Sequence, residues 1–562
     1  MSRKQVPTSY PVGEGRGEEE RQETKRRVIQ NGERIHEHPV SSKALYSSPA
    51  VHMPSIDQLG EIARHCNMDL SSDELKAYRT QMKRTIHTLN EASRLPEPTL
   101  PVKYPRIPGH KPDSQENPYN AWTHVCEIRG AKRGKLLGKR IAVKDNIAVA
   151  GVPLMNGCHA LEGYVPDFDA TVVTRILDQG GTIIGKTRCE DLCYSGSSFT
   201  GAGGPVLNPH DTTRSSGGSS SGSAAAIAAG DVDMALGTDQ GGSIRLPAAW
   251  CGVYGMKPTY GLVPYTGAMS LEPTVDHIGP LGRTVDDCAL LLEVIAGYDN
   301  GLDHRQHPNI RVPQYTKEIQ DCRIEEERIG ILIEGFTTEC GDSMVKSLVY
   351  DTIIQLRHHG AQVEDVSVPM HKLGYMAYAC FAAEGINAAM LQNGGGGYGH
   401  QGYYPSSMIS QVGKAFQSRP NDASHRTKLT RLLGEYLKKN YQGRFYAKGR
   451  NLVLALRHAY DRALQEVDIL AMPTVAYTAS KLPTQDCSIE DHFKMSSACS
   501  INTKPFNTTG HPAINIPVGK INGLPVGLTL VSRHFDEVRL LRVAKYIEQR
   551  CSKNKNRVTA RL

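Results

Sequence analysis

Gly217-Gly218-Ser219-Ser220-Ser221-Gly222-Ser223 is followed by Gly237-Thr238-Asp239-Gln240-Gly241-Gly242-Ser243-Ile244-Arg245. A lysine, Lys144, lies upstream at the end of the apolar run Ile141-Ala142-Val143. Two serines and one lysine suffice for nucleophilic catalysis without histidine, because a neutral lysine can take the attacking serine's proton through the second hydroxyl. The glycines allow backbone N–H groups to approach a developing oxyanion closely.

Other interpretations of the first stretch are weaker. Residues Gly218 to Gly222 match the G-x-S-x-G nucleophile elbow with Ser220 at its centre, but that motif needs a hydrophobic strand directly before it. The preceding residues, 208–214, are typical of a loop. A phosphate-binding loop lacks its G-K-[ST] ending here, and a plain linker does not explain the second cluster at Gly241-Gly242-Ser243.

Composition favours an enzyme with a sizeable core over a nucleic-acid-binding protein. The net charge of +7 is modest for 562 residues, and no long basic block is interleaved with aromatic residues. The 13 cysteines include no CxxC pair, which is typical of reduced intracellular thiols and predicts a cytoplasmic protein. No apolar run is long enough for a membrane span. The ending Ala560-Arg561-Leu562 is the one hint of peroxisomal targeting.

The chain divides into four predicted parts. Residues 1–50 are polar and predict a disordered or loosely attached extension. Residues 51–100 predict a helical arm and a proline-rich linker, with a helix start at Ser71-Ser72-Asp73-Glu74. Residues 101–550 alternate strand and helix patterns, which predict a catalytic α/β domain with a mixed, mostly parallel sheet covered by helices. Residues 551–562 are expected to form a tail.

Histidine offers a rival base but no metal site. His277 and His511 are the strongest candidates, and we interpret both as structural or pocket-lining. The sequence has no H-E-x-x-H spacing, so we expect no metal and no organic cofactor.

The residues resemble the amidase signature family. Lys144, Ser219 and Ser243 fall in that family's order and at similar spacing, and further similarity extends from about Asn117 to about Ile547. The resemblance implies a Ser-cisSer-Lys triad in which Ser243 is the nucleophile, Ser219 relays the proton and Lys144 is the base. It also implies a cis bond between Gly218 and Ser219.

The expected function is therefore hydrolysis of small carboxylic amides to carboxylate and ammonia through an acyl-enzyme on Ser243. Backbone N–H groups of Gln240, Gly241, Gly242 and Ser243 would form the oxyanion hole, and Ser220 and Ser195 would support the site. Bacterial broad-specificity amidases resemble the chain most, and such relatives use the helical arm in a homodimer. Alternatives are a fatty-acid amide hydrolase (which would need a membrane-binding helix), a non-catalytic binding protein and the glutamine-hydrolysing chain of an amidotransferase.

Overall fold

The computed structural model describes residues 49–337, 341–392, 399–484, 486–496 and 500–559. Nearly all of the expected extension at 1–50, and the Ala560-Arg561-Leu562 ending, lie outside these ranges. The chain splits into two compact units between Pro98 and Thr99.

The described part of the first unit contains two helices, α2 (Ile56–His65) and α3 (Ser72–Ala92). Each begins with a capping box, in which a serine and a Glu or Gln three residues later exchange hydrogen bonds with each other's backbone N–H. The expected helix start at Ser71 is thus confirmed. Leu59, Ala63 and Leu75 are buried in a small cluster, whereas Ile62 is 54% exposed.

In the second unit, the described residues form one 11-stranded mixed sheet. The strand order is β1-β3-β2-β6-β8-β7-β12-β13-β11-β9-β10. The strands are β1 (Trp122–Arg129), β2 (Arg140–Lys144), β3 (Thr182–Thr187), β6 (Met234–Thr238), β7 (Tyr254–Lys257), β8 (Ile278–Gly282), β9 (Arg328–Leu332), β10 (Gln362–Val366), β11 (Ile469–Pro473), β12 (Ala513–Ile521) and β13 (Leu524–Val531). A small separate hairpin pairs β4 (Leu207–Asn208) with β5 (Asp211–Ser215).

The sheet combines two parallel segments with an antiparallel centre. β2 pairs in parallel with β3 and β6, and β9 does so with β10 and β11. Between them, pairings through β8, β7, β12 and β13 are antiparallel. The tight Asn522-Gly523 turn between β12 and β13, with positive φ at both residues, permits such a hairpin. The expected mixed α/β sheet is confirmed, with a larger antiparallel share than the strand–helix alternation suggested.

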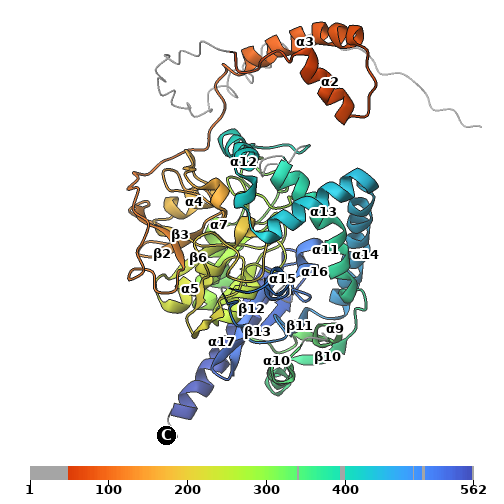
Figure 1. Ribbon diagram of the computed structural model, residues 1–562. Coiled ribbons are helices and arrows are strands. Elements are labelled where there is room, and N and C mark those ends of the chain that lie inside the picture. The colour runs from red at the N-terminus through yellow and green to blue at the C-terminus, as the bar shows by residue number, and fades with distance from the viewer. Residues whose placement is uncertain (1–48, 338–340, 393–398, 485, 497–499, 560–562) are drawn as a thin grey trace, which may run out of the picture. The chain divides into compact units, whose positions relative to one another are not determined.

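Helices cover this sheet (Figure 1). The helices of this unit are α4 (Thr171–Asp178), α5 (Ser221–Ala229), α6 (Arg245–Cys251), α7 (Val285–Ile295), α8 (Tyr315–Glu318), α9 (Ile333–Phe336), α10 (Ser343–Gln355), α11 (His371–Ile386), α12 (Ser406–Ser418), α13 (His425–Tyr441), α14 (Arg444–Glu466), α15 (Ile489–Ser496), α16 (Lys504–Thr509) and α17 (Glu537–Thr559). Short 3-10 and π turns complete them: η1 (His159–Leu161), η2 (Asp191–Cys193), η3 (Leu356–His359), η4 (Asn387–Gln392) and η5 (Pro420–Asp422).

Residues 551–559 of the expected tail continue helix α17. Within the described ranges, no helix combines the length and apolarity that crossing a membrane would require.

Candidate active site

Lys144 lies at the end of β2, beside the end of the parallel strand β6. Carboxyl ends of neighbouring parallel strands meet at one sheet edge, where ligand sites are common. The lysine is fully buried, and its Nζ lies 2.8 Å from Ser219 Oγ and 2.8 Å from Thr238 Oγ1. Two hydroxyl groups therefore fix the position of the amine.

Ser219 precedes helix α5, and the Gly218–Ser219 peptide bond is cis, as the resemblance implied. Gly218 is required at this point because a Cβ atom would clash with the Ser197 carbonyl oxygen. Ser219 is fully buried, so its hydroxyl contacts Lys144 without competition from bulk water.

Ser243 lies in the loop between β6 and α6, which one buried carboxylate organises. Asp239 accepts hydrogen bonds from the N–H groups of Gly242 (2.6 Å) and Ile244 (3.1 Å). Burial alone would raise the pKa of Asp239, but the Arg245 guanidinium holds it well below the ordinary value. The same arginine donates to Asn507 Oδ1 (2.7 Å), which ties the loop to α16.

The expected oxyanion hole needs one correction. The Gly242 N–H already donates to Asp239, so it is not free to receive a developing oxyanion. Among the described residues, no group accepts a hydrogen bond from the N–H of Gln240, Gly241 or Ser243. These three donors therefore remain as candidates. Gly242 still needs to be glycine, because its φ is +129° and a Cβ atom would meet the Thr503 side chain.

The two serines expected to support the site both lie in it. Ser220 donates its N–H to the Ser243 carbonyl (3.2 Å), and its hydroxyl donates to the Thr238 carbonyl (3.2 Å). Ser195 Oγ lies 2.7 Å from Ser197 Oγ and donates to the Ser496 carbonyl (3.1 Å). Within the described residues no hydrogen bond joins the Ser243 hydroxyl to Ser219, and catalytic hydrogen bonds are often long before substrate binds.

Two residues that lie at the site, Thr238 and Cys193, were not selected by the sequence analysis. Thr238 lies inside the quoted second stretch, but only the pairing of β6 with β2 brings its hydroxyl to Lys144. Cys193 lies far upstream and borders the same cavity, where its thiol donates to Asn156 Oδ1 (3.1 Å). Thr238 lies two residues before Gln240, inside a stretch that was already selected, so the sequence could have indicated it. No sequence feature pointed to Cys193.

Ser243 opens onto a cavity of about 490 Å³. Its walls are largely aromatic and aliphatic, from Tyr194, Leu246, Leu271, Tyr375, Tyr378, Tyr477 and Ile501. Three cationic side chains, Arg426, Lys494 and Lys504, also border it, and no carboxylate does so among its described lining residues. The Lys504 ammonium lies 4.3 Å from the ring centroid of Tyr375, and the Arg426 guanidinium 5.2 Å from that of Tyr194.

Neither rival histidine borders this cavity in the described residues. His277 Nδ1 lies 2.8 Å from the Val275 carbonyl oxygen. His511 Nε2 lies 3.0 Å from the Asp461 carboxylate, apart from the described lining of the cavity. Both histidines are buried, and neither is in a position to serve Ser243 as a base.

Known proteins are similar to this chain over most of its length. The family model described as Amidase matches residues 119–541. The chain is 39% identical over 497 residues to an enantioselective amidase of Rhodococcus rhodochrous, covering 88% of this chain and 95% of that protein. It is 37% identical over 420 residues to the A-type chain of a glutamyl-tRNA(Gln) amidotransferase of Methanosarcina mazei, covering 74% and 85% of the two chains.

Solved structures are similar to this chain over about three quarters of its length. The native peptide amidase of Stenotrophomonas maltophilia superposes with a TM-score of 0.62 at 27% identity, covering 75% of this chain and 84% of that one. The A-type chain of the glutamyl-tRNA(Gln) amidotransferase from Thermotoga maritima gives a TM-score of 0.61 at 29% identity, with coverage of 76% and 86%.

Proposed function

This chain belongs to the amidase signature family and is a hydrolase of amide C–N bonds, and we propose that it cleaves small carboxylic amides through an acyl-enzyme on Ser243. The observation that carries the proposal is the buried contact of 2.8 Å between Lys144 Nζ and Ser219 Oγ, beside the loop that holds Ser243. A buried hydroxyl between an amine and a serine provides the path that the proton needs.

In the proposed reaction, Ser243 Oγ attacks the amide carbonyl carbon and gives its proton to Ser219, which passes a proton to Lys144. The carbonyl oxygen becomes an oxyanion that the N–H groups of Gln240, Gly241 and Ser243 stabilise; one such donor is worth about 3 kcal/mol. Collapse breaks the C–N bond while the proton returns through Ser219 to the nitrogen, and ammonia leaves. Water then releases the carboxylate by the same relay.

The cavity supports a narrower substrate class. Tyrosines and aliphatic side chains line the path from Ser243. We therefore propose that the preferred substrates carry an apolar or aromatic body.

A glutamine-hydrolysing chain of an amidotransferase remains the second candidate, because such chains are among the relatives. The test is ammonia release by the purified chain alone. Turnover of simple primary amides without tRNA or a second protein supports a free-standing amidase. Turnover of glutamine only, and only with a partner, supports the amidotransferase role.

We further propose that the chain is a cytoplasmic homodimer that uses its first unit as the contact. Ile62, Tyr78 and Leu89 on α2 and α3 are about half exposed, with relative exposures of 54%, 48% and 47%. Apolar helix faces of this kind are usually covered in an assembly, and most homo-oligomers are two-fold.

A further inference from the structure

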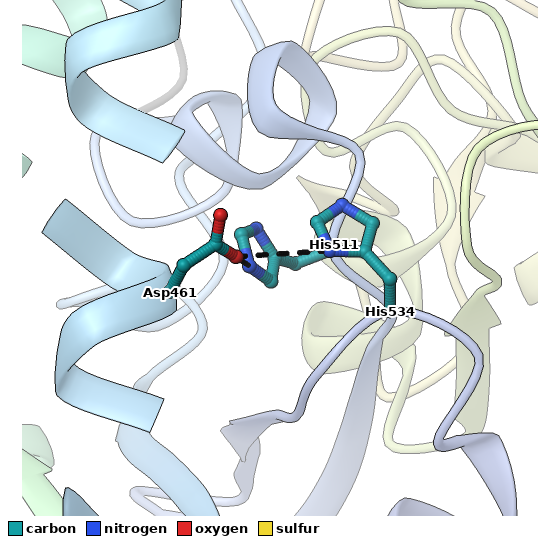
Figure 2. Close-up of side chains that lie close together, drawn as sticks. All are labelled: Asp461, His511 and His534. Atoms are coloured by element: carbon teal, nitrogen blue, oxygen red, sulfur yellow. Dashed lines mark hydrogen bonds and ion pairs between the residues drawn. The ribbon is translucent and has the colours of Figure 1, made fainter. Parts of the chain in front are cut away.

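A second cluster of ligand-type side chains lies apart from the lining of the Ser243 cavity. It consists of Asp461 on α14, His511 between α16 and β12, and His534 after β13, whose ligand atoms all lie within 4.8 Å of one another. Figure 2 shows the two imidazole rings and the carboxylate directed toward one another. His511 Nε2 lies 3.0 Å from Asp461 Oδ1, and His534 Nδ1 lies 3.9 Å from the same oxygen.

Thr509 determines which ring nitrogens carry protons. His534 Nε2 lies 2.9 Å from the Thr509 carbonyl oxygen, and a carbonyl only accepts, so Nε2 carries a hydrogen. The Thr509 hydroxyl lies 3.0 Å from the Pro505 carbonyl oxygen and 2.9 Å from His511 Nδ1. When its proton points to the Pro505 carbonyl, the hydroxyl accepts from His511 Nδ1–H, and Nε2 is then the lone-pair nitrogen of the ring.

The other nitrogen of each neutral ring therefore carries a lone pair. His511 Nε2 and His534 Nδ1 both direct that lone pair toward the carboxylate oxygen of Asp461. Three electron-pair donors that face one another repel unless a cation lies between them.

We propose that Asp461, His511 and His534 bind a divalent transition-metal ion of the zinc type, at a site separate from the amidase centre. Two imidazoles and one carboxylate are zinc ligands, and bonds of about 2.0–2.2 Å at tetrahedral angles put ligand atoms about 3.3 Å apart. The observed separations of 3.0 and 3.9 Å need only small side-chain shifts. Hydrogen bonds from the outer ring nitrogens to Thr509 are the orienting contacts that metal-binding histidines usually make.

The site is accessible and connected to the catalytic domain. The Asp461 side chain is 41% exposed, which leaves a path for the ion and for a water as the fourth ligand. Its second oxygen faces Arg457 at 3.9 Å, so Oδ1 remains for the metal. His511 follows α16 directly, and Asn507 of α16 holds the loop of Ser243 through Asp239. A bound ion would therefore fix α16.

The test is zinc titration of the chelator-treated full chain, by calorimetry and by thermal unfolding. One equivalent should bind saturably and raise Tm, because a ligand that binds only the folded state stabilises it. Asp461→Asn and His534→Asn each should weaken binding by about ten-fold or more. His358→Asn, at an exposed histidine of η3, should leave it unchanged.

Cobalt substitution gives an independent readout, since a tetrahedral cobalt centre is coloured and the colour should be lost in His534→Asn. Asp461 and His534 are partly exposed, so these variants are expected to fold even if a variant of buried His511 does not. No saturable binding, or equal binding by wild type, Asp461→Asn and His534→Asn, would overturn the proposal. The cluster would then be a hydrogen-bonded group with the Thr509 hydroxyl turned toward His511.

Discussion

Arg245 and Asp239 form an ion pair of 3.0 Å between two side chains that are both fully buried. The carboxylate of this pair also accepts the N–H groups of Gly242 and Ile244, on either side of Ser243. The pair therefore shapes the loop that carries the proposed nucleophile. A charge pair buried in this way must be kept intact, because one uncompensated partner is very costly.

Replacing Asp239 by Asn should destabilise the protein by about 3–5 kcal/mol, since Arg245 stays buried without its counter-charge. Asp321→Asn is the matched control. It breaks an exposed ion pair with Arg323, which water screens, so its effect on the free energy of unfolding should be much smaller. Urea unfolding at neutral pH measures both, and equal effects of the two variants would contradict the structural role of Asp239.

The Asp239 contribution should depend on pH in one direction. Its folded pKa lies below the ordinary value of 3.8, so the stabilisation is fully present above that value and is lost as the pH falls below it. The stability gap between wild type and Asp239→Asn should therefore be constant from neutral pH down to about pH 5 and narrow below about pH 4. A gap that widens on acidification would contradict this assignment.

Ser243→Ala should fold normally and lose at least about 10⁴-fold in kcat, because the proposed acyl-enzyme forms on the Ser243 hydroxyl. A fluorophosphonate probe should label wild type at Ser243, as peptide mapping would establish, and should not label Ser243→Ala. Ser221→Ala, a neighbouring buried serine outside the proposed relay, is the control and should keep most activity. An adduct on another residue would overturn the assignment.

Lys144→Arg should be as inactive as Lys144→Ala, since a guanidinium stays protonated and cannot act as the base. Thr238→Val should keep the relay but lose one hydrogen bond to Nζ, worth about 1–1.5 kcal/mol, or about a ten-fold drop in kcat. Steady-state ammonia assays measure kcat for each variant and distinguish a complete loss from a drop of about ten-fold. Near-normal activity of Lys144→Arg would remove the lysine as the base.

Deleting residues 1–50 should leave a homodimer, whereas deleting 1–95 should give monomers or insoluble protein, because α2 and α3 are then removed. Light scattering at micromolar concentration measures the mass of each. Ile62→Glu, on the exposed apolar face, is the point variant and should weaken the dimer without loss of helix content. A monomeric full-length chain would refute the proposal.

The sequence by itself indicated the class of chemistry, because Lys144, Ser219 and Ser243 fall in the order and at the spacing of the amidase signature family. Glycine and serine are needed locally, wherever backbone N–H groups must approach a reacting atom. The helix start at Ser71 and the mixed sheet could be predicted for a similar reason, since caps and strand–helix alternation are local patterns. Such features depend on residues that are neighbours in the chain.

Only the tertiary structure decided what surrounds those residues. Thr238 contacts Lys144 because β6 pairs with β2. The Gly242 N–H is not available to an oxyanion because it donates a hydrogen bond to Asp239. Asp461, His511 and His534 come from three separate elements, so no short spacing could reveal them. Contacts between residues far apart in sequence depend on strand order and packing, which local patterns do not encode.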